Sequence, residues 1–195
     1  RMKVFVAAGT GLAPFTSIID EYYHQSGHAD NFAVVHGASY PEDLGYRERL
    51  EELLNKGREG RGLRYIASIS RPKEAENWEG LTGRVESHFE PDRINYLEHE
   101  LGLEEGELNP NNCVVMICGL QGTITNTTAA LLYRGFVPAD RKLRRALGIP
   151  KEMSASLYWE QYDTEPIIDT KDEALVGELA NRLRGAGVET EAAAT

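Results

Sequence analysis

One stretch near the start of the chain, residues 4–15, constrains the fold more than any other part of the sequence. Residues 4–8 are all apolar, which predicts a strand buried on both faces, as in a parallel sheet. Gly9 and Gly11 then allow a tight turn, and from Leu12 onward apolar residues recur every three or four positions, as in a helix. Pro14 falls in the first helical turn, where its missing N–H costs little.

This order of strand, glycine turn and helix predicts an anion site. Free backbone N–H groups and the helix dipole point at whatever binds there, and a nucleotide pyrophosphate is the ligand that such turns most often hold. The turn departs from the Gly-x-Gly-x-x-Gly pattern, because Pro14 stands where the third glycine belongs. Taken alone, the pattern is equally compatible with an ordinary strand-to-helix turn.

Strands and helices alternate along the rest of the chain. This alternation predicts an α/β fold with a parallel, Rossmann-like sheet and helices on both faces. Right-handed crossovers make 3-2-1-4-5 the simplest strand order for five strands. The expected strands are residues 4–8, 32–37, 63–69, 113–118 and 154–159.

A second glycine turn, at residues 119–122, follows the most apolar run of the chain, at 113–118. In the expected topology both glycine turns lie at the carboxyl edge of the sheet, where the strand order reverses. Ligands of doubly wound sheets bind at this switch point. The two turns together therefore favour a nucleotide cleft over two unrelated turns.

Composition and charge narrow the class of protein. The 195 residues suit one α/β domain with a tail, and we predict a nucleotide-binding domain over 1–162 and a partly helical extension over 163–195 whose end is disordered. A net charge of −10 argues against nucleic acid as a partner, and no apolar run is long enough for a membrane span. The two cysteines, Cys113 and Cys118, suggest reduced thiols in a cytoplasmic protein. Because the chain starts at Arg1, we expect it to be a piece of a longer polypeptide.

Basic residues follow the third expected strand. Ser70 and Arg71 come directly after it, and Arg84 follows a Leu-Thr-Gly run shortly afterwards. A guanidinium matches phosphate because its planar fork offers paired N–H donors and stays charged. Two arginines and a hydroxyl would suit the 2′-phosphate of an adenosine ribose. Spacing alone leaves open that both arginines are solvated surface residues.

Four motifs in this order resemble the NADP-binding domain of the ferredoxin–NADP reductase family. They are residues 9–15 (Gly-Thr-Gly-Leu-Ala-Pro-Phe), 70–71 (Ser-Arg), 81–84 (Leu-Thr-Gly-Arg) and 118–122 (Cys-Gly-Leu-Gln-Gly). The resemblance covers roughly residues 3–160. It implies the second half of a flavin-dependent oxidoreductase, with the FAD held by an N-terminal barrel that precedes this domain.

The resemblance also implies roles for individual residues. Cys118 would lie beside the nicotinamide as the catalytic residue, where a small polarisable thiol suits a ring that slides against flavin. The alternative for Cys118 is an ordinary buried thiol. The residues expected to bind the dinucleotide are Gly9, Thr10, Gly11, Pro14, Ser70, Arg71, Arg84, Gly119 and Gln121.

The chain departs from the family pattern in two places. Bacterial relatives often have an arginine just after the second strand, where this chain has Ser39 and Tyr40, so that NADP is favoured over NAD without being decided. Family members commonly end near an aromatic residue that covers the flavin. Tyr158 and Trp159 are the candidates here, and packing within an edge strand is the alternative for both.

Metal binding is not expected. His24 and His28 have the i, i+4 spacing of a metal pair, but no third ligand lies near them in the sequence, so we interpret them as surface histidines at a helix end.

We therefore expect the NADP-binding half of a ferredoxin–NADP reductase-like flavoprotein. It would position the nicotinamide for hydride exchange with FAD, and electrons would pass to or from ferredoxin or flavodoxin. Without the FAD domain, the chain by itself would be inactive. The alternatives are a nucleotide-sensing module without turnover and an NADH-dependent reductase of the cytochrome b5 reductase type.

Overall fold

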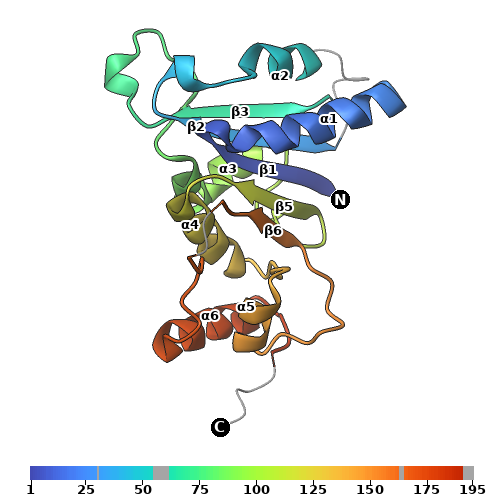
Figure 1. Ribbon diagram of the computed structural model, residues 1–195, viewed down its shortest axis with the longest axis vertical. Helices are drawn as coiled ribbons and strands as arrows, with labels where there is room; N and C mark the ends of the chain where they lie inside the picture. Colours follow the sequence, from blue (N-terminus) through green and yellow to red (C-terminus); the bar gives the residue numbers. More distant parts are fainter. Residues whose placement is uncertain (30, 55–61, 163–164, 191–195) are drawn as a thin grey trace.

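A parallel sheet with helices on both faces forms the body of the protein. The computed structural model describes residues 1–29, 31–54, 62–162 and 165–190, and within these the sheet has six strands (Figure 1). The strands are β1 (Met2–Ala8), β2 (Phe32–Ala38), β3 (Arg64–Ile69), β4 (Leu81–Thr82), β5 (Cys113–Cys118) and β6 (Leu157–Glu160). The α-helices are α1 (Ala13–Ser26), α2 (Arg47–Leu54), α3 (Ile94–Glu100), α4 (Gln121–Leu132), α5 (Arg141–Ala146) and α6 (Glu173–Gly185).

The strand order is β4-β3-β2-β1-β5-β6, and every pairing is parallel. The five expected strands are all present and neighbour one another as expected, but the predicted number of strands was wrong. The sixth strand, β4, has two residues, and pairs Leu81 with Ser68 and Thr82 with Ile69 at the edge of β3. So short a run has no readable alternation of apolar and polar residues, which explains why the sequence did not predict it.

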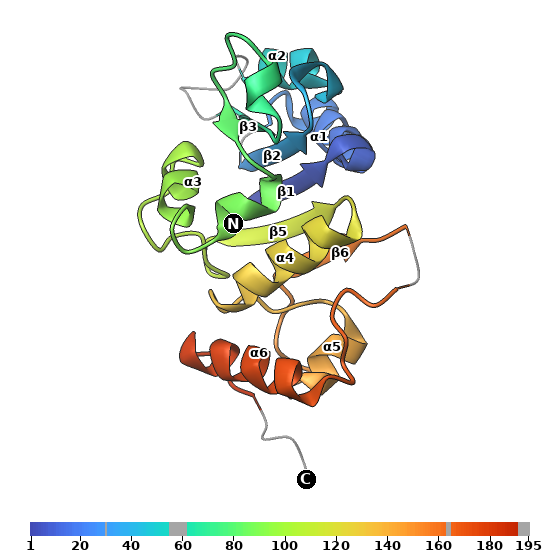
Figure 2. The same cartoon turned by 90° about the vertical axis from the view of Figure 1, so that its left-hand side faces the viewer.

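The central strand β1 separates two apolar cores. Val4 and Val6 belong to the core that also receives side chains from α3, α4 and α6. Phe5, the next residue, faces the core on the side of α1 and α2, where its ring stacks on Phe15 with centroids 4.5 Å apart. Figure 2 shows α1 and α2 on one side of the sheet and α3 on the other. Successive side chains of a strand point to opposite faces, so an all-apolar strand requires a cover on each face.

Local backbone signals set the limits of α1. A short 3₁₀ turn, η1 (Gly9–Leu12), precedes it, and Pro14 lies in its first turn. The helix ends at Gly27, whose φ of 74° lies in the left-handed region, and the Gly27 N–H donates to the Tyr23 carbonyl. Glycine reaches this conformation without a Cβ penalty, and this explains a sharp stop after Ser26.

The segment between β4 and β5 is held by a buried carboxylate. Glu98 of α3 is fully buried, and its Oε1 accepts the Leu108 N–H at 2.7 Å while Oε2 accepts the Gly106 N–H at 3.0 Å. Arg134, just past the end of α4, completes the cluster by pairing with Glu98 and donating from Nε to the Leu108 carbonyl at 2.8 Å. A buried charge is tolerated only when it is paired and hydrogen-bonded, as here.

The C-terminal segment packs against α4. The Thr125 hydroxyl donates to the Ile167 carbonyl at 2.9 Å, and Ile167 and Ile168 are buried in the same core as α4. Helix α6 adds Leu179 and Leu183 to that core. The expected helix in this segment is thus present, whereas residues 163–164 and 191–195 lie outside the described part, and the division into a domain and an extension at 162/163 stays a prediction. In the described part of the chain, no helix has the length and apolar character needed to cross a bilayer.

Replacing Arg134 by Met should lower the free energy of unfolding by about 2–3 kcal/mol, because the Glu98 carboxylate would stay buried with only its backbone partners. Equilibrium urea unfolding measures this change. Arg141→Met, at an exposed position of α5, is the matched control and should change stability by less than about 0.5 kcal/mol. Equal effects of the two substitutions would contradict the importance of this cluster.

Candidate nucleotide-binding site

A cleft of about 850 Å³ opens at the carboxyl ends of the central strands. It lies between the ends of β1 and β2, the loops after β3 and β4, and the start of α4. The lining residues include Ala8, Gly9, Thr10, Ser39, Ser70, Arg71, Arg84, Glu86, Leu120, Gly122 and Thr123. Five of the predicted site residues, Gly9, Thr10, Ser70, Arg71 and Arg84, therefore line one cavity.

The two glycines of the first turn have different structural roles. Gly9 has a φ of 54°, and a Cβ there would meet no atom within 4 Å, so Gly9 serves the backbone conformation and leaves the cleft open. A Cβ on Gly11 would lie 2.2 Å from the Cys118 carbonyl oxygen. Gly11 therefore lets the β1 turn pack directly against the end of β5, and it does not line the cleft.

A cluster around Arg71 forms the wall beyond β3. The N–H groups of Ser70 and Arg71 donate to the carbonyls of Ala38 and Ser39, which extends the β2–β3 ladder and brings Tyr40 beside Arg71. The Arg71 guanidinium lies 5.2 Å from the centroid of the Tyr40 ring and donates to the Tyr40 hydroxyl, which in turn donates to Glu74 at 3.0 Å. The bond to Tyr40 raises the pKa of Arg71 further.

Arg84 also lines the cleft. Its side chain is 80% exposed, so the guanidinium is available to a ligand. Its Nη1 is 4.0 Å from Oε1 of Glu86, a carboxylate only 9% exposed. Glu86 also accepts a hydrogen bond from the Thr123 hydroxyl at 3.2 Å. This acid in the cleft was not expected from the sequence, because no motif marks an isolated Glu within a short 3₁₀ turn.

The loop that carries Arg84 is fixed from inside the protein. The Ser68 hydroxyl donates to the Gly83 carbonyl at 2.8 Å, and His88 Nε2 lies 2.8 Å from the same hydroxyl. Because the single hydroxyl proton is used on Gly83, His88 must donate from Nε2. Burial lowers the pKa of His88, in keeping with a neutral ring.

His36 is the second buried histidine of this edge. It belongs to β2, is fully buried, and lies between the Tyr65 hydroxyl (3.2 Å from Nδ1) and the Gly9 carbonyl oxygen (3.4 Å from Nε2). Burial lowers the pKa of His36 to about 4, and the contact with Gly9 opposes this shift only in part. Burial also raises the pKa of the Tyr65 hydroxyl, so both groups are neutral near pH 7.

Cys118 ends β5 and is fully buried. Burial raises the pKa of its thiol, and its Sγ lies 3.6 Å from the hydroxyl of Tyr162. Tyr162 is 72% exposed and stands just beyond β6, whose Glu160 pairs with Cys118 in the sheet. The thiol thus contacts an exposed aromatic side chain as well as the core.

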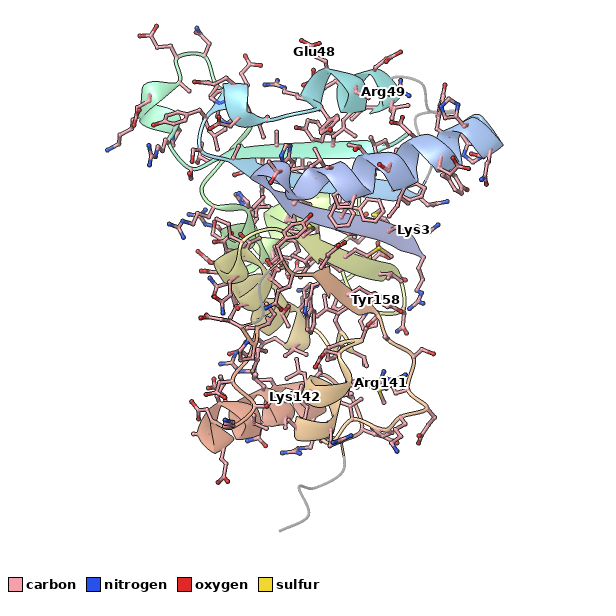
Figure 3. All side chains as sticks on the ribbon, in the orientation of Figure 1. Lys3, Glu48, Arg49, Arg141, Lys142 and Tyr158 are labelled. Carbon is pink, nitrogen blue, oxygen red and sulfur yellow. The ribbon has the colours of Figure 1, made fainter. Side chains whose placement is uncertain are left out.

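The aromatic residue that contacts Cys118 is Tyr162, and the expected role of Tyr158 or Trp159 in covering a flavin stays a prediction. Trp159 packs against the core, and the Tyr158 hydroxyl donates to the Ala155 carbonyl at 3.3 Å (Figure 3 labels Tyr158 on β6). Only the pairing of β6 with β5 shows that Tyr162, beyond the strand end, reaches the thiol.

Three other predicted site residues lie beside the cleft without lining it. A Cβ on Gly119 would be 3.1 Å from the Ala8 Cβ, so Gly119 lets the two strand ends approach each other. The Gln121 amide donates to the Pro166 carbonyl at 3.5 Å and thus holds the C-terminal segment. Pro14 is half-buried in the first turn of α1. The dinucleotide contacts of the predicted residues stay a prediction.

The sequence of the chain matches the model of one protein family, described as the oxidoreductase NAD-binding domain, over residues 5–128. The chain belongs to this family. This match and the relatives described next together confirm the resemblance to the NAD(P)-binding domain of ferredoxin–NADP reductases.

Two curated relatives of this oxidoreductase NAD-binding domain are named as reductases of NADP with ferredoxin or flavodoxin. Ferredoxin–NADP reductase B of Sorangium cellulosum is 31% identical over 140 residues, which cover 72% of this chain and 51% of that protein. Flavodoxin/ferredoxin–NADP reductase of Buchnera aphidicola is 30% identical over 141 residues, or 72% of this chain and 48% of that protein. The chain spans about half the length of the curated relatives it matches.

A solved structure gives the same result for the fold. The ferredoxin–NADP⁺ reductase of Neisseria gonorrhoeae, crystallised with bound FAD and NADP, superposes with a TM-score of 0.60 at 25% identity. The match covers 81% of this oxidoreductase NAD-binding domain and 55% of the other chain.

The buried His36 predicts a pH dependence of stability. In the unfolded chain the ring takes up a proton near its ordinary pKa of 6.5, whereas the folded ring does so only at about 4. Between these values the unfolded state binds more protons, so stability is fully present above pH 6.5 and is lost as the pH falls toward 4. The loss from this group amounts to about 3 kcal/mol at most.

His36→Gln removes the titrating group and keeps a polar side chain. The wild type should therefore lose more stability than His36→Gln between pH 6.5 and 4, as measured by urea unfolding at each pH. Carboxylates titrate in both proteins and cancel in the comparison. Parallel stability curves for the two proteins would show that His36 is protonated as easily in the folded state as in the unfolded state.

Proposed function

We propose that this chain is the NADP(H)-binding half of a ferredoxin–NADP reductase-like flavoprotein. The observation that carries the proposal is the cleft itself, in which the Gly9–Thr10 turn and the side chains of Ser70, Arg71 and Arg84 converge from different loops. The proposal draws further support from relatives named as ferredoxin–NADP or flavodoxin/ferredoxin–NADP reductases.

In this proposal the dinucleotide lies along the cleft. Its 2′-phosphate binds the guanidinium groups of Arg71 and Arg84 and the Ser70 hydroxyl, since paired N–H donors match phosphate oxygens. Its pyrophosphate meets the backbone at Gly9 and Thr10. Tyr40 orients Arg71. Its role therefore differs from that of the arginine that bacterial relatives often carry nearby.

The nicotinamide end belongs at Cys118. The neutral thiol, the end of β5 and the Gly119 turn form the surface against which the ring would pack, with Tyr162 occupying that place when no ring is bound. FAD, when bound by a neighbouring domain, supplies the hydride chemistry, and this chain supplies binding and orientation. The partners are then a flavin-binding domain of the same polypeptide and an electron carrier of the ferredoxin or flavodoxin type. The two buried, free cysteines suit a reducing compartment such as the cytoplasm.

Titration of the chain with NADP⁺ and NAD⁺, followed by calorimetry, tests the 2′-phosphate subsite. NADP⁺ should bind more tightly by about 1–3 kcal/mol, from the charge-assisted contacts to its extra phosphate. Arg71→Ala and Arg84→Ala should each reduce this preference and leave NAD⁺ affinity nearly unchanged. Arg141→Ala, an exposed arginine of α5 labelled in Figure 3, is the control and should keep the preference. Equal affinities of the wild type for NADP⁺ and NAD⁺ would refute the subsite.

The position of Tyr162 predicts a second result. Tyr162→Ala should bind NADP⁺ several-fold more tightly than the wild type, because the nicotinamide would no longer have to displace the phenol from Cys118. Adenosine 2′-monophosphate, which has no nicotinamide, should bind both proteins equally. Tyr158→Ala is the control, since Tyr158 is directed to Ala155. An unchanged NADP⁺ affinity in Tyr162→Ala would argue against a nicotinamide site at the thiol.

A further inference from the structure

The buried histidine of β2 has a defined donor and a defined acceptor. The Tyr65 hydroxyl has one proton, and donating it to Nδ1 of His36 leaves the ring proton on Nε2, facing the Gly9 carbonyl oxygen. The opposite tautomer would set the Nε2 lone pair against the carbonyl oxygen and leave that contact repulsive. The arrangement Tyr65 O–H to His36 Nδ1, then His36 Nε2–H to Gly9 O, satisfies all three groups.

The peptide bond that follows Gly9 transmits this contact to the cleft. The described residues include no cis peptide bond, so the Gly9 carbonyl and the Thr10 N–H point in opposite directions within one peptide plane. Because His36 holds the carbonyl from the interior of the sheet, the Thr10 N–H faces away from that interior. Gly9 and Thr10 both line the cleft, and Thr10 is the second residue of η1, where a backbone N–H has no earlier partner within the turn.

We propose that His36 is a positioning residue for the dinucleotide site: its Nε2–H anchors the Gly9 carbonyl and thereby directs the Thr10 N–H at the pyrophosphate. The inference rests on the proposed function. Gly9 has a φ of 54°, and a Cβ there would have no atom within 4 Å. Because glycine has the greatest backbone freedom of all residues, a hydrogen bond to its carbonyl restricts the conformation of this turn. The neutrality of the ring keeps the acceptor at Nδ1 for Tyr65 across the physiological pH range.

This role separates His36 from the residues of the 2′-phosphate subsite. NADP⁺ and NAD⁺ share the pyrophosphate, so loss of the anchor weakens both dinucleotides alike. Adenosine 2′-monophosphate carries only the 2′-phosphate and does not need the Gly9–Thr10 peptide. A defect confined to ligands with a pyrophosphate is therefore the signature of the anchor, whereas general damage to the cleft would weaken every ligand.

The experiment compares four variants of the full chain by calorimetric titration with NADP⁺, NAD⁺ and adenosine 2′-monophosphate. His36→Leu, which has no donor, should bind both dinucleotides about five- to tenfold more weakly, the effect of one lost hydrogen bond, with unchanged affinity for adenosine 2′-monophosphate. His36→Gln, whose amide N–H reaches the place of Nε2, should restore most of the dinucleotide affinity. Arg71→Ala should show the reverse selectivity, and His24→Leu, at an exposed position of α1, is the matched histidine control.

Nitrogen-15 NMR of the His36 ring gives a readout that does not depend on a ligand. The ring should be neutral with its proton on Nε2. A proton on Nδ1 in the wild type would overturn the proposal. Wild-type dinucleotide affinity in His36→Leu, or an equal loss for all three ligands, would overturn it as well. A wild-type chain that binds neither NADP⁺ nor adenosine 2′-monophosphate would instead overturn the proposed function itself.

Discussion

The close approach of two strand ends is the constraint on which the site depends. β1 pairs with β5 along the whole length of β5, and the two strand ends meet so tightly that a Cβ on Gly11 would overlap the Cys118 carbonyl. On the other side, the β1 turn is tied to β2 through Gly9 and His36. Three neighbouring strands thus converge on one short backbone segment. Its freedom to approach a ligand comes from glycine, and its precision comes from the neighbours that surround it.

Basic side chains lie at the cleft although the chain as a whole is acidic. The chain as a whole carries a net charge of −10, yet two arginines stand at the walls of the cleft. Arg71 is oriented by an aromatic ring and a hydroxyl, and Arg84 stays near a buried carboxylate while remaining exposed. An anionic ligand therefore meets two guanidinium groups in the cleft, which Asp43 and Glu86 also line. Glu86, which accepts a hydrogen bond from Thr123 in the first turn of α4, adds a carboxylate acceptor to the cleft. A carboxylate is suited to bind the hydroxyl groups of a ligand and not its phosphates.

Much of this arrangement was readable before the structure. The apolar runs predicted five of the strands, and their spacing predicted the neighbours of β1, because parallel strands joined by right-handed crossovers have few alternative orders. The Gly-Thr-Gly turn and the Ser70–Arg71 pair were found because each is a local motif. The residues that escaped were those whose partners are far away in the sequence: β4 is too short for a pattern, Glu86 stands alone in its turn, and His36 gave no sign that it touches Gly9. Gly11 is required for packing against Cys118, and a glycine required for packing looks the same in sequence as one required for a ligand, so its predicted contact with the dinucleotide stays a prediction.

The sequence by itself determined the class of fold and the family, and it predicted the places along the chain where a nucleotide would be held. These follow from local spacing, since side-chain alternation, glycine turns and helix starts act over a few residues. Only the tertiary structure decided which aromatic residue covers Cys118, which side chain orients Arg71, and which buried histidine holds the first glycine turn. Each of these contacts joins residues about 27–44 positions apart, and such a contact depends on sheet register and loop path, which no local pattern encodes.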